Sequence, residues 1–200
     1  MPKSISDWAI GMEDLKNKLR REGIIARESL SREERKSASI RIVKQILKSP
    51  EYKDAEIVML YKAVRGEVRL DSLETDPSAL GKRLVYPYCK NKADMEALEP
   101  AGKDSWRKGS FGIPEPLPEK SPEVSPDRID LVICPCTVFD ENCNRIGMGA
   151  GYYDRFLDKC VNAHIISVAF EVQKADDIPV DTWDKAMEKI YTETGVYPKI

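Results

Sequence analysis

One short apolar run, Asp130-Leu-Val-Ile-Cys134, constrains the fold of this chain more than any other segment. A strand that is apolar at every position is usually buried on both faces, and such strands occur mainly in parallel sheets covered by helices on each side. Similar runs occupy residues 56–61, 83–87, 164–170 and 190–192. Because helical spacing separates several of these runs, the sequence predicts an α/β fold, a mostly parallel central sheet with helices on both faces.

Apolar spacing also predicts the helices. Two of them fall between residues 10 and 47, with Gly23 as a break in the first pattern. Ser31 and Glu34 have the capping-box pattern that starts the second helix. A further helix, between the first two strands, is predicted from three leucines: Leu70, Leu73 and Leu80. The only histidine, His164, begins a predicted buried strand and is interpreted as structural.

The segment over residues 90–127 differs from the rest of the chain. It is rich in Pro, Lys, Glu and Gly and contains one short strand candidate at residues 95–98. We predict an extended loop, and long loops in compact domains often carry function. We treat residues 1–200 as one domain, in which residues 1–15 form a flexible or helical extension.

Composition excludes several classes of protein. The 32 basic and 34 acidic residues give a formal net charge of -2, which offers no broad cationic face for a nucleic acid. No apolar run approaches the roughly 18 residues of a membrane span, and the charged N-terminus does not resemble a signal peptide. Five cysteines without a CxxC pair predict reduced thiols. We expect a cytoplasmic monomer that binds neither nucleic acid nor membrane.

A glycine-rich turn, Arg145-Ile-Gly-Met-Gly-Ala-Gly-Tyr-Tyr-Asp-Arg155, precedes a predicted helix over residues 151–160. A strand, a glycine turn and a helix together can bind phosphate, because glycines let backbone N–H groups approach an anion. Arg145 can reach phosphate oxygens, and Asp154 can ligate a cation. The same residues are equally compatible with a tight connection in which Asp154 only favours the helix dipole. A Walker A pattern is absent, and the spacing does not fit a dinucleotide fingerprint.

The order of the motifs resembles the 5-formyltetrahydrofolate cyclo-ligase family, also called 5,10-methenyltetrahydrofolate synthetase. The glycine turn, preceded by Cys134-Pro135 and Phe139-Asp140, is similar to that family's hallmark. Other short matches follow the family's order along the chain: Lys16 to Arg20, Gly66-Glu67-Val68, Phe111 to Pro116, Phe170 with Gln173, Asp184, and Thr192-Glu193. Ordered matches over nearly the whole chain are more specific than any one of them.

The resemblance implies an enzyme that uses ATP and Mg²⁺ to close 5-formyltetrahydrofolate to 5,10-methenyltetrahydrofolate. The formyl oxygen would attack the γ-phosphorus, N10 would attack the activated carbon, and phosphate would leave. An amide oxygen is a poor leaving group near neutral pH, so a phosphorylation step suits the chemistry. Phosphoryl transfer needs cations and N–H donors around the moving charge more than it needs a covalent residue.

The resemblance also implies roles for individual residues. The nucleotide-binding set is Lys16, Arg20, Arg145, Gly147, Met148, Gly149, Ala150, Gly151, Tyr152 and Tyr153. The catalytic set is Arg145, Tyr153 and Asp154. The folate-binding set is Tyr61, Glu67, Phe111, Tyr152 and Gln173, in which Glu67 would accept the pterin N–H groups. Two carboxylates are enough for Mg²⁺, and the predicted ligands are Asp154 and Asp184.

Each role has a simpler interpretation. Lys16 and Arg20 lie one helical turn apart and, without the family, are typical of a solvated face. Glu67 is otherwise a surface residue at a strand-to-helix turn, and Tyr61 is equally compatible with the core. Met148 and Ala150 depart from the family pattern, so any phosphate charge at this turn would depend on the basic residues named above.

Two other functions stay open on the sequence alone. One is an unrelated ATP- or phosphate-binding α/β enzyme, and the other is a folate or nucleotide binder that has lost turnover. Glu67 with Phe111 argues against the first, because a sugar phosphate needs no pterin-sized pocket. Retention of Arg145, Asp154 and Asp184 argues against the second.

Overall fold

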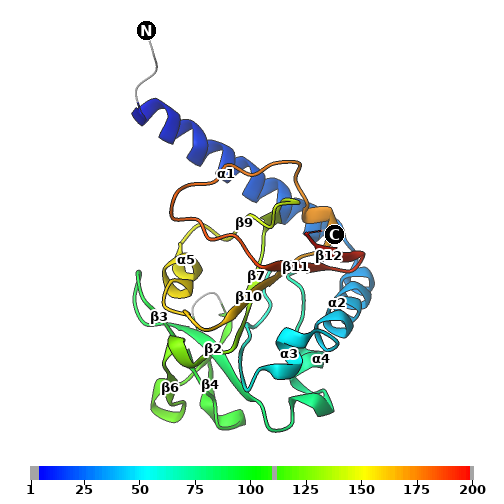
Figure 1. Ribbon diagram of the computed structural model, residues 1–200, viewed down its shortest axis with the longest axis vertical. Coiled ribbons are helices and arrows are strands. Elements are labelled where there is room, and N and C mark those ends of the chain that lie inside the picture. The colour runs from blue at the N-terminus through cyan, green and yellow to red at the C-terminus, as the bar shows by residue number, and fades with distance from the viewer. Residues whose placement is uncertain (1–4, 110–111, 199–200) are drawn as a thin grey trace.

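The computed structural model describes residues 5–109 and 112–198, so the predicted folate contact Phe111 lies outside the described residues. In that part of the chain, one eight-stranded sheet has the order β12-β11-β10-β7-β1-β2-β3-β6 (Figure 1). The strand β7 (Leu131–Pro135) lies between β1 (Ile57–Met59) and β10 (His164–Val168) and is parallel to both. The prediction of a central parallel strand at this run is confirmed.

Parallel pairing continues one strand further on each side and then ends. The outer parallel strands are β2 (Arg83–Cys89), beside β1, and β11 (Lys189–Thr192), beside β10. The antiparallel strands at the edges are β3 (Met95–Leu98), β6 (Glu123–Val124) and β12 (Gly195–Tyr197). Two small antiparallel pairs lie outside this sheet: β4 (Trp106–Lys108) with β5 (Pro114–Pro116), and β8 (Val138–Phe139) with β9 (Arg145–Ile146).

The predicted extended loop over residues 90–127 is therefore more ordered than expected. It contributes β3 and β6 to the edge of the main sheet and contains the β4–β5 pair. Among the described residues of this segment and its end, single turns of 3-10 helix adjoin these strands at Lys103–Ser105, Pro118–Lys120 and Pro126–Arg128. Prolines favour such turns because their φ is fixed. The proline-rich composition that predicted an extended loop therefore corresponds to turns between short strands.

Helices cover both faces of the sheet, as predicted. Side chains of β1 alternate between the faces: Ile57 and Met59 pack in the cluster that contains α5 (Tyr152–Leu157). Val58 and Leu60 pack in the opposite cluster. The helices of that opposite cluster are α2 (Arg32–Ile46), α3 (Pro50–Asp54) and α4 (Asp71–Glu74). Burial on both faces explains why these strands are apolar at successive positions.

The helix α1 (Ile5–Ser29) runs without interruption through Gly23, so the prediction of a break there is wrong. Gly23 is buried, and a Cβ atom at this position would overlap the Thr137 carbonyl oxygen and the Val138 side chain. The glycine therefore permits close helix-to-strand packing. The capping box that starts α2 is confirmed, because the Ser31 and Glu34 side chains each accept the other's backbone N–H.

Two other expectations are corrected. Leu70 and Leu73 are buried, but α4 has only four residues and Leu80 is 84% exposed. Pro77 starts a separate turn of 3-10 helix, Pro77–Ala79, which ends the predicted apolar face. His164 begins β10 as predicted, yet its side chain is exposed and its Nδ1 lies 2.7 Å from Glu188 Oε2.

The cysteine prediction holds. All five thiols are free, with Cys89 exposed and the other four buried. Within residues 5–109 and 112–198, no helix has both the length and the apolar character needed to cross a membrane.

Candidate functional site

The predicted nucleotide residues meet beyond the carboxyl end of β7, where the β8–β9 pair and the glycine turn follow that strand (Figure 1). This edge of an open α/β sheet is the usual place for a ligand. The helix α1 crosses the same end of the molecule and packs on β8 through Gly23. Segments from opposite ends of the chain therefore form one surface.

The glycine turn has the backbone conformation that its sequence predicted. Gly149 has φ +95° and Gly151 has φ +66°, a left-handed region that side chains with a Cβ atom disfavour. Gly151 is also the residue that precedes α5. Arg20 of α1 lies against this turn: its Nε donates to the Gly147 carbonyl at 2.9 Å, and its guanidinium covers Gly149. A fixed cation therefore lies on the turn, as anion binding requires.

Arg145, the first residue of β9, is buried beside the same turn, with 3% of its side chain exposed. Its Nη2 donates to Asp154 Oδ1 at 2.8 Å, and its guanidinium carbon lies 5.8 Å from the centroid of the Tyr153 ring. The Nε atom is buried and has no acceptor among the described residues. A buried donor without an acceptor costs about 1–3 kcal/mol, so this atom is suited to an anionic ligand.

Lys16 does not point freely into solvent, because two carboxylates hold it. Its Nζ lies 2.6 Å from Asp181 Oδ2 and 2.5 Å from Asp184 Oδ2. Burial opposes the charged form of Lys16, but the hydrogen bonds to both aspartates outweigh burial and raise its pKa. A predicted nucleotide ligand and a predicted metal ligand are thus brought together, and they are paired with each other.

The two predicted magnesium ligands have different internal partners: Asp154 is paired with Arg145 and Asp184 with Lys16. No group of three or more His, Cys, Asp or Glu side chains converges as a metal site in the described part of the chain. Each carboxylate is partly exposed, 31% for Asp154 and 24% for Asp184. Hard carboxylate oxygens suit Mg²⁺, which takes its remaining ligands from water and phosphate, so this donor set fits the ion.

Glu67, the predicted folate ligand, is buried with 7% exposure. Its Oε2 accepts the Val64 N–H at 3.0 Å, and its Oε1 lies 3.6 Å from Nη2 of Arg27. Burial raises the pKa of this carboxyl group. The turn that carries it is closed by Tyr61, whose hydroxyl donates to the Val68 carbonyl at 2.7 Å. Tyr61 is itself buried, so its geometry matches the simpler interpretation as a core residue.

Tyr153, the second residue of α5, lies beside Arg145. Burial raises its pKa well above the usual value, and the neighbouring Cys134 and Glu67 raise it further, so its hydroxyl stays protonated. Tyr152 faces the other way, and its hydroxyl donates to the Asn91 carbonyl at 2.8 Å. The glycine turn is therefore connected to the segment after β2.

Gln173 is buried, and backbone groups occupy its amide completely. Its Nε2 donates to the carbonyls of Cys136, at 3.0 Å, and Thr137, at 2.8 Å. Its Oε1 accepts the Phe170 N–H at 2.9 Å. These bonds hold the 3-10 turn Glu171–Gln173 against the residues at the end of β7, so Gln173 stabilises the backbone of this region. Its contact with folate stays a prediction.

Three charged residues of this region were not predicted from the sequence. Two of them are Arg27, which lies beside Glu67, and Asp181, which is paired with Lys16. No sequence motif distinguishes either residue from an ordinary charged residue on the surface. The third is Lys62, three residues after the end of β1, whose Nζ lies 4.9 Å from the ring centroids of both Tyr86 and Trp106. Contact with two aromatic rings is detectable only once the strands have been paired.

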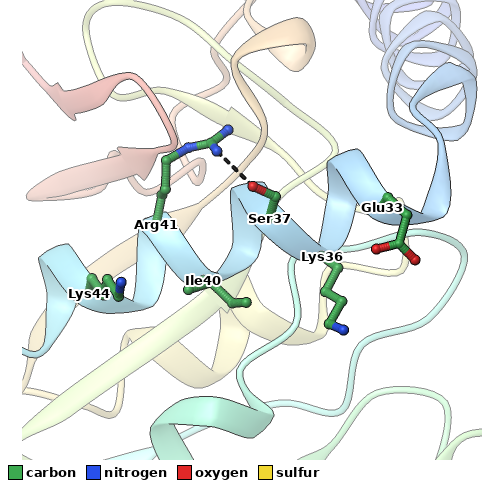
Figure 2. Close-up of a pocket in the computed structure, with 6 residues that line it drawn as sticks. All are labelled: Glu33, Lys36, Ser37, Ile40, Arg41 and Lys44. Atoms are coloured by element: carbon green, nitrogen blue, oxygen red, sulfur yellow. Dashed lines mark hydrogen bonds between the residues drawn. The ribbon is translucent and has the colours of Figure 1, made fainter.

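A shallow pocket on the outer surface of α2 is separate from these residues. Figure 2 shows its basic side chains spread along the helix, with Arg41 Nη1 donating to Ser37 Oγ at 2.8 Å. None of its lining residues belongs to the predicted nucleotide or folate sets: Glu33, Lys36, Ser37, Ile40, Arg41 and Lys44. This face has the character of a solvated helix surface.

Comparison with known proteins bears directly on this geometry. The model of the 5-formyltetrahydrofolate cyclo-ligase family matches residues 12–193. The chain belongs to this family. The 5-formyltetrahydrofolate cyclo-ligase of Mus musculus is 27% identical to it, over 92% of this chain and 97% of the relative. A probable enzyme of the same name from Schizosaccharomyces pombe is 31% identical, over 82% of this chain and 88% of the relative.

A solved structure of this family has the same fold. The NMR structure of Aquifex aeolicus 5,10-methenyltetrahydrofolate synthetase superposes with a TM-score of 0.80 and 31% identity, covering 93% of this chain and 94% of that chain. The family and the enzyme class predicted from the ordered motifs are therefore confirmed. The family match begins at residue 12, whereas α1 already begins at Ile5.

The pairing of Lys16 makes a prediction about stability and pH. Because the pKa of Lys16 is raised in the folded chain, its contribution to stability is complete below the ordinary value of 10.5 and is lost as the pH rises through the higher folded value. Lys16→Met should therefore lower the free energy of unfolding at neutral pH by about 1–3 kcal/mol. The difference from the wild type should shrink above pH 10.5.

Chemical denaturation across this pH range measures the effect. Lys18→Met is the matched control, because Lys18 is on the same helix with 64% of its side chain exposed. A Lys16 variant as stable as the Lys18 variant at neutral pH would contradict the pairing.

Proposed function

We propose that this chain closes 5-formyltetrahydrofolate to 5,10-methenyltetrahydrofolate in a reaction that depends on ATP and Mg²⁺ and releases ADP and phosphate. One observation carries the proposal: two cations, Arg20 and the buried Arg145, lie at the left-handed glycine turn, and Arg145 keeps a buried donor without an acceptor among the described residues. Membership of the 5-formyltetrahydrofolate cyclo-ligase family supports folate as the substrate.

The nucleotide half consists of the turn and the basic residues around it. Arg20, Arg145 and Lys16 would bind the phosphates, together with backbone N–H groups from Gly147 to Tyr153. Support comes from the position of Arg20 over the turn and from the free Nε of Arg145. Met148 is 44% exposed and, with Ala150, adds no charge. The phosphates would therefore depend on the three cations.

Asp154 and Asp184 would hold Mg²⁺, which when bound neutralises phosphate charge during phosphoryl transfer. In the described structure these carboxylates are paired with Arg145 and Lys16 respectively. Each pair contains one residue proposed for the metal and one proposed for the nucleotide. Binding of a metal–nucleotide complex would therefore exchange each internal pair for two contacts with the ligand.

The folate half would be built around Glu67. An ionised carboxylate can accept two N–H groups from the amino-pyrimidine edge of a pterin. Tyr61, Tyr152 and Phe111 remain our candidates for the rest of the folate site, since a flat heterocycle gains from aromatic contact. Gln173 would act by fixing the strand end on which this half rests.

The chemistry then requires the two halves to hold their ligands in line. The formyl oxygen would attack the γ-phosphorus, the bond from phosphorus to the ADP oxygen would break, and an imidate-like phosphate would form. N10 would attack the formyl carbon and release its proton to the departing phosphate or to water, and the carbon–oxygen bond would break as phosphate leaves. Arg145 would bind the phosphoryl oxygens throughout, while the protonated Tyr153 would lie between the two halves. Catalysis of this kind depends on position and charge.

We also propose that residues 1–200 act as one domain and as a cytoplasmic monomer. The balanced charge and the five free thiols support this proposal.

A direct assay tests the function. Purified protein is mixed with 5-formyltetrahydrofolate and MgATP, and near-ultraviolet absorbance follows the methenyl product. We expect a signal that requires ATP, because the formyl oxygen cannot leave without phosphorylation. Omission of ATP and replacement by ADP are the controls. Folded protein that gives no ATP-dependent signal with fresh substrate would rule the activity out.

Asp154 gives a second, sharper test. Removing a magnesium carboxylate should lower kcat by about 100-fold, since the metal supplies several kcal/mol of charge stabilisation. Asp154→Ala is compared with Asp158→Ala, which removes a carboxylate from the end of the same helix where 74% of the side chain is exposed. Circular dichroism confirms that both variants fold. Equal activities in the two variants would remove Asp154 from the metal site.

A further inference from the structure

Arg27 is the only cation in the described part of the chain with none of its surface exposed. It lies in the last turn of α1, and its neighbours along that turn are mostly exposed. A buried guanidinium that did not meet acceptors would be strongly destabilising. Its position therefore calls for a reason beyond the stability of the helix.

The guanidinium contacts three separate parts of the candidate site. Its Nε donates to the Arg65 carbonyl at 2.9 Å, in the turn that follows β1. Its Nη1 donates to the Cys136 carbonyl at 3.4 Å, just beyond β7. Its Nη2 has no hydrogen-bond acceptor among the described residues and lies 3.6 Å from Oε1 of Glu67. The Nη2 atom of Arg27 therefore faces the Glu67 carboxylate but forms no hydrogen bond with it.

From this geometry we infer that Arg27 is a positioning residue for folate binding, which fixes the orientation of Glu67 and keeps it ionised. The inference rests on the proposed function, because Glu67 matters only if it binds the pterin. Arg27 itself lies behind the carboxylate and is not proposed to touch the substrate.

The charges around Glu67 explain why such a residue is needed. Burial raises the pKa of Glu67, whereas the Val64 N–H, Arg27 and Arg65 lower it. The other titratable groups near it, Tyr61 and Tyr153, have raised pKa values and stay neutral. Among the described residues, Arg27 is therefore the only fully buried cation that offsets the cost of an ionised carboxylate here, and a guanidinium keeps its charge at every pH of interest.

A purely structural role for Arg27 makes different predictions. Its backbone contacts partly duplicate others, because Gln173 Nε2 also donates to the Cys136 carbonyl. If those contacts were its whole function, replacement would lower stability and affect both substrates alike. If it acts through Glu67, replacement should impair folate binding selectively and in a pH-dependent way.

The test compares Arg27→Gln, Arg27→Lys, Glu67→Gln and the double variant Arg27→Gln/Glu67→Gln in the full chain. We expect Arg27→Gln to raise the KM for 5-formyltetrahydrofolate about 10-fold, while the KM for ATP changes less than about 2-fold. The acidic limb of kcat/KM for folate should move to higher pH, because loss of the cation raises the pKa of Glu67. Arg27→Lys should restore most of the pH profile. Arg27→Gln should add little to Glu67→Gln.

Arg35→Gln is the matched control, since Arg35 donates to the Arg27 and Glu28 carbonyls at the end of α1 and lies near Gly66, but forms no hydrogen bond or ion pair with Glu67 among the described residues. We expect it to lower stability without moving the pH limb. An Arg27→Gln variant that matches this control, or whose effect adds fully to that of Glu67→Gln, would overturn the inference.

Two further readouts keep the inference separate from the proposed function. If Arg27→Gln does not fold, Arg27→Lys decides, because lysine keeps the charge but lacks the planar fork that orients Glu67. Its pH profile should stay near that of the wild type while the KM for folate rises more than the KM for ATP, and an equal rise in both KM values would overturn the inference. If the wild type makes no product, the proposed function fails, and the inference is then tested by NMR titration of the Glu67 carboxyl group. An unchanged titration of Glu67 in Arg27→Gln would overturn it.

Discussion

The close packing of α1 on the end of the sheet is the constraint on which the rest of the site depends. Gly23 allows this contact, because any Cβ atom there would overlap the backbone at Thr137. Once the helix lies this close, three cations spaced along it reach separate acceptors on the carboxyl side of the sheet: Lys16, Arg20 and Arg27. One glycine therefore aligns the basic residues of both halves of the site.

Oppositely charged side chains lie together both where α1 contacts the rest of the chain and at the glycine turn. Lys16 is paired with Asp184, and Arg27 lies beside Glu67, while Arg145 and Asp154 form a third pair within the glycine turn. Pairing avoids the cost of buried isolated charges and fixes each group before a ligand binds. The cost is that ligands must compete with internal partners, which binding of a polyanion together with a divalent cation can do.

The sequence predicted those features that depend on local chemistry. The sheet followed from strands buried on both faces, the start of α2 from its capping box, and the glycine turn from the need for a left-handed backbone at Gly149 and Gly151. Features set by tertiary contact were missed. Gly23 has the pattern of a helix break until Thr137 lies against it, and Arg27 has the pattern of a solvated residue until the sheet encloses it. Leu80 was misassigned because Pro77 ended its helix.

The central claim is that the nucleotide and folate halves form one site in which the formyl oxygen and the γ-phosphoryl group meet. Isotope transfer tests this claim most directly. 5-Formyltetrahydrofolate labelled with ¹⁸O in the formyl group is turned over with unlabelled MgATP in unlabelled water, and the released phosphate is analysed by mass spectrometry. We predict one ¹⁸O atom in each phosphate formed. Unlabelled phosphate, with the label released into water, would contradict it.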